Sequence, residues 1–273
     1  GNSLFSKQDL FHSLAKRKRK KRRISTFAPK TSVNLSSHIL PKLFKQLSIS
    51  TEDTAQVLVI GAGSSKNWLD KKSSPYNNIK IIYSDIDSAS EVDLYCDAHS
   101  LPFIDSSFDG IIIVAVLEHV LYPEIVVKEI KRVIKNNGLL YSEIPFMQHV
   151  HEGAYDFTRY TLSGHRRLFN SFTEIKSGMV AGPGTVLVWS IENFFISFFM
   201  KKQLRNIVKA MSRYLFFWIK YFDFIFRNKP QAMDGASCTY FYGKKNNESK
   251  ISDKEIINIY IGAKLINHID KGE

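Results

Sequence analysis

The sequence has few cysteines and no apolar run of the about 20 residues that a membrane-spanning helix needs. Cys96 and Cys238 lie far apart, so they give neither a disulfide framework nor a metal-ligand cluster. We therefore expect no metal site, and a reducing, cytoplasmic location. The beginning of the chain is polar and then basic, with no apolar stretch after the charges, which predicts no secretory signal peptide.

Acidic residues are almost absent from the beginning of the chain. Residues 1–30 hold ten Lys or Arg and one Asp, so they carry nine of the twelve net positive charges. The eight consecutive bases at 16–23 repel one another, which predicts a disordered tail. Such a tail adheres to polyanions. Anionic lipid and RNA both stay open as partners, with nucleic acid ranked lower.

Apolar runs and helical periodicity predict alternating strands and helices between residues 56 and 145. The expected strands are 56–60, 80–84, 93–96, 108–116, 139–144, 172–180 and 238–243. The expected helices are 36–48, 64–71, 123–135 and 162–169, and Asn136-Asn137-Gly138 is expected to end the third of them. The alternation favours an α/β fold with a doubly wound, mostly parallel sheet.

An aromatic and basic stretch, residues 183–235, lies between the last two expected strands. Residues 189–226 hold 13 of the 35 aromatic residues, with six bases and two acids. Glu192, Lys220 and Asp223 divide it into pieces too short to cross a bilayer. Two interpretations stay open: a helical subdomain packed on the sheet, or two helices lying in a membrane surface with aromatics down and bases up.

Ligand-binding signals follow three strands in turn. Gly61 and Gly63 end the first strand, where glycines permit a tight turn and contact between a ligand and bare backbone. Asp85, about 20 residues later, is placed to accept hydrogen bonds from ribose hydroxyls. Asp97, after the third strand, is placed to accept from an adenine amino group. For a single acid at a strand end, a helix cap is the ordinary alternative.

These signals, with Leu101-Pro102-Phe103, Ser107-Phe108-Asp109 and Leu117-Glu118-His119-Val120, resemble the class I S-adenosylmethionine-dependent methyltransferases of the type-11 subfamily. The resemblance covers residues 50–180 and implies a Rossmann-like seven-stranded sheet with helices on both faces and an antiparallel last strand. It implies S-adenosyl-L-methionine as cofactor. The implied cofactor-binding residues are Gly61, Ala62, Gly63, Asp85, Ile86, Asp97, Ala98 and Leu117.

The resemblance also divides the chain into parts. The tail is residues 1–30, the methyltransferase domain 31–182 and 236–250, the helical insertion 183–235, and a C-terminal helix or tail 251–273. Two positions depart from the family pattern. Val59 replaces the usual acid, and Ser65 the usual third glycine. Either Ser64 and Ser65 substitute for them, or the domain has lost activity.

A polar segment, residues 145–161, follows the fifth strand at the expected mouth of the cofactor cleft. It resembles the His-Glu…Asp…Arg-Tyr-Thr loop of bacterial type-11 members found among surface-polysaccharide enzymes. The candidate substrate-binding residues are His149, Tyr155, Asp156, Arg159 and Tyr160. For Asp156 and Arg159, three apart, we favour an ion pair that holds the loop over a direct catalytic role.

Methyl transfer to oxygen benefits from a general base, for which the candidates are, in order, His151, His149, His119 and Glu152. A carboxylate acceptor would need no base. The expected acceptor is a hydroxyl of a glycan or lipid-linked sugar, with the enzyme peripheral at the inner face of the membrane. The alternatives are an RNA or protein methyltransferase recruited by the basic tail, and a non-catalytic membrane-surface module.

Overall fold

The computed structural model describes residues 28–246 and 250–263. The predicted disordered tail therefore lies almost wholly outside the described residues. Seven strands form one sheet in the order β3-β2-β1-β4-β5-β7-β6. Their bounds are β1 (Ala55–Ile60), β2 (Ile79–Asp85), β3 (Leu94–Tyr95), β4 (Phe108–Val114), β5 (Ile134–Pro145), β6 (Phe172–Ala181) and β7 (Cys238–Lys245). The first five strands pair in parallel and β7 runs antiparallel to β5 and β6, which confirms the predicted fold class.

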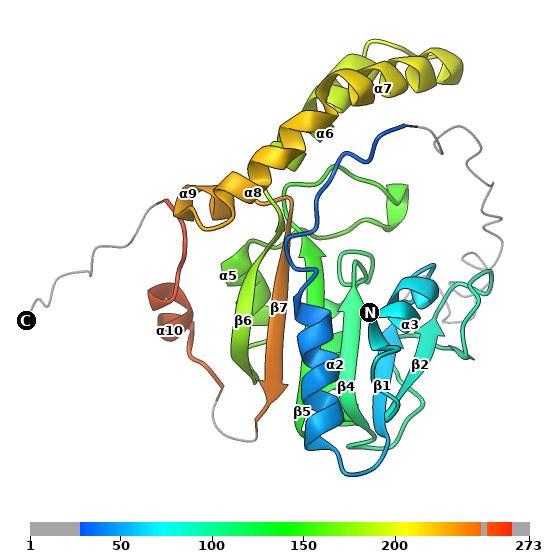
Figure 1. Ribbon diagram of the computed structural model, residues 1–273, viewed down its shortest axis with the longest axis vertical. Coiled ribbons are helices and arrows are strands. Elements are labelled where there is room, and N and C mark those ends of the chain that lie inside the picture. The colour runs from blue at the N-terminus through cyan, green and yellow to red at the C-terminus, as the bar shows by residue number, and fades with distance from the viewer. Residues whose placement is uncertain (1–27, 247–249, 264–273) are drawn as a thin grey trace, which may run out of the picture.

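Helices cover both faces of this sheet (Figure 1). Apolar side chains of α2 (Ile39–Ser50) and α3 (Lys66–Ser73) fill one core, and those of α4 (Pro123–Val133) fill the other. A 3₁₀ turn, η1 (Gly153–Tyr155), and α5 (Leu162–Leu168) follow β5. The remaining helical elements are α6 (Pro183–Ile196), α7 (Lys202–Phe216), η2 (Phe217–Tyr221), α8 (Phe222–Phe226), α9 (Pro230–Asp234) and α10 (Asp253–Asn258).

Two predicted boundaries are wrong. Helix α4 ends at Val133, and Asn136-Asn137-Gly138 lies inside an irregular start of β5 instead of ending a helix. A Cβ at Gly138 would meet the carbonyl oxygen of Lys135 at 2.9 Å, so this glycine permits a close backbone approach. Strand β4 ends at Val114, before the predicted 116, because Ala115 turns the backbone with φ of +54°.

The carboxyl ends of the parallel strands meet at one edge of the sheet. Ile60 pairs with Ser84 on one side and with Ile113 on the other, and Asp85 pairs with Tyr95. The turns after β1, β2, β3 and β4 therefore open at the same edge. In open α/β sheets this edge is where ligands bind.

The insertion forms a hairpin of α6 and α7 that projects beyond this edge and does not lie over a face of the sheet (Figure 1). Asp223, fully buried, accepts hydrogen bonds from the N–H groups of Gly182, Gly184 and Thr185 and so anchors the beginning of α6. Glu192 on α6 pairs with Lys209 and Arg213 on α7. Among the described residues, no helix is long and apolar enough to cross a membrane.

Candidate functional site

The two glycines after β1 have different structural roles. Both adopt left-handed backbone conformations, with φ of +66° at Gly61 and +51° at Gly63. A Cβ at Gly61 would lie 2.2 Å from a methyl carbon of Val116, so this glycine lets the segment after β4 pack against the turn. A Cβ at Gly63 would meet nothing closer than Asp85 Oδ2, at 4.0 Å. Of these two glycines, Gly63 is therefore the one whose backbone faces open space.

The Asp85 carboxylate ties this turn to the end of β2. Its Oδ2 accepts a hydrogen bond from the Gly63 N–H at 2.7 Å, and its Oδ1 accepts one from the Asp87 N–H at 2.8 Å. The Ser90 hydroxyl also donates to Oδ2, at 3.4 Å, so the remaining acceptor capacity for a ribose hydroxyl is mainly on Oδ1. The Ser65 hydroxyl is buried nearby and has no hydrogen-bond partner among the described residues. A bare glycine, a carboxylate with acceptor capacity left and an unpaired hydroxyl fit a bound S-adenosylmethionine.

The remaining predicted cofactor residues lie around the same edge. Ile86, directly after Asp85, is half-buried, and Ala98 packs against the core beside α4. Asp97 Oδ1 accepts from the His99 N–H at 2.9 Å and lies 2.7 Å from His99 Nδ1. The side chain of Leu117 is fully buried in the core, so only its backbone can border a ligand.

An acid, Glu143, lies two strands away from Val59, the position where the family pattern has an acid. Val59 is buried and aligned through Ile112 with Tyr141 on β5, and Glu143 follows two residues later on the same face, nearer the carboxyl edge. The Glu143 carboxylate accepts hydrogen bonds from the hydroxyls of Tyr141 and Ser36. Burial raises the pKa of Glu143. Sequence reasoning missed this residue because cross-strand alignment is not visible in the sequence.

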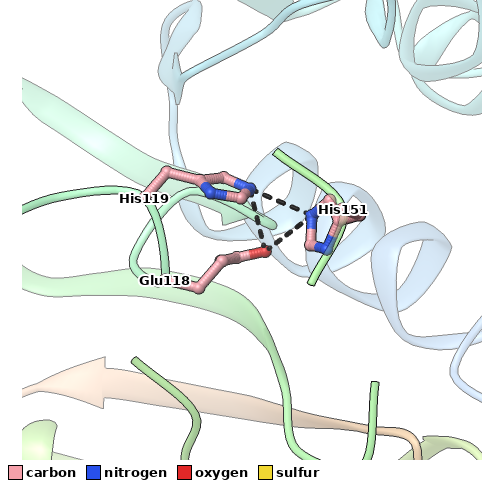
Figure 2. Close-up of side chains that lie close together, drawn as sticks. All are labelled: Glu118, His119 and His151. Atoms are coloured by element: carbon pink, nitrogen blue, oxygen red, sulfur yellow. Dashed lines mark hydrogen bonds and ion pairs between the residues drawn. The ribbon is translucent and has the colours of Figure 1, made fainter. Parts of the chain in front are cut away.

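Two side chains from the segment after β4 and one from the loop after β5 converge, and Figure 2 shows them pointing toward one another. The Nε2 atoms of His119 and His151 are 3.0 Å apart. Glu118 Oε1 lies 3.5 Å from His119 Nε2 and 3.8 Å from His151 Nε2. The structure thus brings together the two predicted catalytic histidines. It adds Glu118, which the sequence analysis passed over although it lies between Leu117 and His119 at a strand end.

The polar loop orients both imidazoles. His119 Nδ1 donates to the carbonyl oxygen of Tyr155 at 2.7 Å, and His151 Nδ1 faces Asp156 Oδ2 at 3.4 Å. Asp156 forms the predicted ion pair with Arg159, and hydrogen bonding to that guanidinium keeps the pKa of Asp156 well below its usual range. This pair therefore positions His151, in line with the favoured interpretation.

Burial shifts the acidity of the cluster. The side chain of Glu118 is fully buried, and desolvation raises its pKa to about 7. Burial also lowers the pKa of His119, which favours the neutral imidazole. His119 and His151 remain 21% and 31% exposed. The arrangement can therefore exchange protons near neutral pH with a molecule arriving from solvent.

The other predicted loop residues lie around this cluster. Glu152 precedes η1, and its charge offsets a small part of the lowering of the His119 pKa that burial causes. His149 is exposed, and its carbonyl oxygen accepts from Arg159 at 3.5 Å. Tyr160 packs against the core beside α4. Glu152, His149 and Tyr155 stay candidates for acceptor binding.

Comparison with known proteins agrees with this geometry. Residues 59–142 match the sequence profile of a methyltransferase domain family, Methyltransf_11. No curated protein matches the chain. The structure resembles a provisionally named sarcosine dimethylglycine methyltransferase from Galdieria sulphuraria (TM-score 0.50, 14% identity, covering 81% of this chain and 95% of that one). It also resembles phosphoethanolamine N-methyltransferase 2 from Haemonchus contortus in complex with S-adenosyl-L-methionine (TM-score 0.50, 13% identity, covering 79% and 54%).

At these low sequence identities, the structural likeness shows the fold only. The assignment as a methyltransferase rests on the match to the domain family. The matched residues run from β1 to β5 and include the glycine turn, Asp85, Asp97 and the Glu118–His119 pair. The protein is thus an enzyme with an S-adenosylmethionine-dependent methyltransferase domain.

Proposed function

We propose that the protein transfers a methyl group from S-adenosylmethionine to a hydroxyl of a glycan or lipid-linked sugar. The observation that carries this proposal is the Glu118–His119–His151 cluster at the edge of the sheet where the cofactor turns open. Transfer to a carboxylate, which is already ionised at neutral pH, needs no such group at the acceptor. A hydroxyl must lose its proton as the new bond forms, and a base near neutral pKa suits that step.

The chemistry follows from the cofactor, which supplies a methyl group already activated on a sulfonium. Gly63 and Asp85 hold the nucleoside side of the site, and the 145–161 loop presents the acceptor. The acceptor oxygen forms the new C–O bond while the old C–S electron pair returns to sulfur. The hydroxyl proton leaves toward the imidazole pair. Alignment in line and proton removal are the contributions of this chain.

The helical hairpin supports a lipid-linked acceptor. One stripe of α7 exposes Leu204, Ile207, Met211, Tyr214 and Leu215, between 44% and 61% of each side chain. A shallow apolar groove of about 630 Å³ runs along this stripe. Exposed bases at Lys201, Lys202 and Arg205 lie at the beginning of the same helix. Apolar side chains beside exposed bases match the chemistry of an anionic lipid surface.

One transfer assay tests the proposal. The full chain is incubated with methyl-labelled S-adenosylmethionine and lipid-linked sugars in anionic vesicles, free glycans, RNA or peptides. We expect label in the sugar acceptors, and a fall in rate of about 100-fold in His151→Gln, the size of a lost general base. Label in RNA that disappears at raised salt would favour the tail-recruited alternative instead. No label with any acceptor, together with no cofactor binding, would favour the non-catalytic module.

The same assay separates surface binding from chemistry. Ile207→Glu places a charge in the apolar stripe and should lower transfer to vesicle-bound acceptors only. Ile49→Glu is the matched control, because Ile49 is also an exposed helical isoleucine but lies on the last turn of α2, at the opposite end of the sheet (Figure 1). Equal losses in the two variants would contradict a membrane role for the hairpin.

A further inference from the structure

We propose that Glu118, His119 and His151 bind a divalent transition-metal ion. One ligand atom from each residue lies within 4.8 Å of the other two. The three separations of 3.0, 3.5 and 3.8 Å define a triangle, and the point equidistant from its corners lies about 2.0 Å from each atom. Metal–nitrogen and metal–carboxylate bonds have this length, so an ion fits without rearrangement (Figure 2).

The groups beside the two imidazoles favour one tautomer of each ring. A carbonyl oxygen can only accept, so His119 Nδ1 carries the proton that it donates to Tyr155. The Asp156 carboxylate lies 3.4 Å from His151 Nδ1, and its negative charge favours the tautomer with the proton on that nitrogen. In the neutral rings, both Nε2 atoms then present lone pairs at 3.0 Å from each other. Two facing lone pairs repel unless a cation lies between them.

Glu118 gives an independent argument. Both of its carboxylate oxygens are buried and lack a hydrogen-bond partner among the described residues. A buried carboxylate without a partner is costly, and a coordinated cation supplies the missing charge and contact. Tyr155 and Asp156 then act as outer partners that orient the ligating histidines, an arrangement typical of metal sites.

The donor set narrows the ion and its role. Two imidazoles and one carboxylate suit zinc, manganese, iron or cobalt, whereas magnesium and calcium prefer oxygen ligands. Three protein ligands leave at least one position open, as in catalytic sites. The partly exposed imidazoles place that position toward solvent. If the proposed function also holds, the bound ion takes over the part given above to the imidazole base. An acceptor hydroxyl bound at the open position would then lose its proton to water, because the cation lowers the pKa of the oxygen that it binds. The expectation of no metal site rested on cysteine spacing, which this cluster does not use.

Metal binding is tested without any acceptor. The full chain, without an affinity tag and dialysed against a chelator, is titrated with Zn²⁺ by calorimetry and with Co²⁺ by absorption. We expect one ion per chain, bound at least about 100-fold more weakly in Glu118→Gln and His151→Gln, since each loses a ligand. His149→Gln is the matched control, an exposed histidine two residues away on the same loop. It should bind as the wild type does.

Circular dichroism and cofactor binding of each variant show whether it is folded. If a ligand variant does not fold, the Co²⁺ spectrum of the wild type decides, because ligand-field bands of nitrogen and oxygen coordination must appear at one equivalent. No binding by the wild type, or equal binding by folded variants, would overturn the metal site. Metal binding without methyl transfer would leave the site standing and remove the proposed function. Methyl transfer that chelation leaves unaffected would leave the proposed function standing and count against the metal site.

Discussion

The cofactor half and the proposed acceptor half of the site are built differently. In the cofactor half, short turns after β1 and β2 are locked by backbone hydrogen bonds to Asp85. In the acceptor half, the side chains of Glu118 and His119 meet His151 from a loop about 30 residues further along the chain. The first half depends on local backbone geometry. The second depends on tertiary packing of a loop that Asp156 and Arg159 hold in place.

This difference explains how the two halves can vary separately. The cofactor half needs glycines and an acid at fixed spacing, which many acceptor sites can share. The acceptor half needs a loop whose shape depends on a few ion pairs and carbonyl contacts. Substitutions in one half should therefore leave the other half working, and the predictions below test that separation.

The largest expected effect is on folding, at Gly61. Gly61→Ala places a Cβ against Val116 at a left-handed backbone position, so we expect a loss of about 3 kcal/mol in the free energy of unfolding. Urea denaturation measures it. Gly63→Ala, with open space at its Cβ, is the matched variant. Gly63→Ala should lose about 1 kcal/mol of stability. It should weaken cofactor binding more than Gly61→Ala does. Equal stability losses would contradict separate roles for the two glycines.

The second effect is on cofactor binding at Asp85. Asp85→Asn replaces a charged acceptor of the Gly63 N–H, so we expect the dissociation constant of S-adenosylhomocysteine to rise about 50-fold, or about 2.3 kcal/mol. Calorimetry measures this. Asp87→Asn, two residues away, is the control and should bind almost normally. Glu118→Gln should also bind the cofactor normally, and a parallel loss there would show that the two halves are not separable.

The fold was largely predictable because its signals are local. The apolar runs at β1 and β4 and the periodicity of α2 and α4 appear directly in the sequence. Where prediction failed, tertiary contacts determined the local structure. Residues 136–138 form a bulge because β5 already pairs with β4 at Ile134, before these residues, and pairs with it again at Leu139. In the site, the glycines and Asp85 were predictable from spacing. Glu118 and Glu143 were not, since their significance lies in burial and in neighbours from other strands.

The third effect concerns a buried histidine outside the Glu118–His119–His151 cluster. His165 is fully buried on α5, with its ring nitrogens 3.0 Å from the hydroxyls of Ser142 and Thr239. Burial lowers its pKa to about 3, below the 6.5 of an unfolded chain. The unfolded state therefore binds more protons between these values, and stability present above pH 6.5 is lost as the pH falls toward 3.

We expect His165 to remove about 2 kcal/mol of stability between pH 7.5 and pH 5. Urea midpoints of the wild type and His165→Gln at the two pH values measure the difference, because glutamine does not titrate. An identical pH dependence in wild type and His165→Gln would show that the buried ring is charged in the folded protein.

The smallest effect concerns Glu143, the acid that stands two strands from Val59 on the same face. If this carboxylate receives the ammonium group of the cofactor, Glu143→Gln should weaken S-adenosylhomocysteine binding about tenfold, or about 1.4 kcal/mol. Methylthioadenosine lacks the amino-acid part and should bind the wild type and the variant equally. Tyr141→Phe removes a hydroxyl partner of Glu143 but keeps the charge, and serves as the control. Equal weakening of both ligands would mean that Glu143 supports the sheet edge and does not contact the cofactor, which would leave the acid missing at position 59 without a replacement.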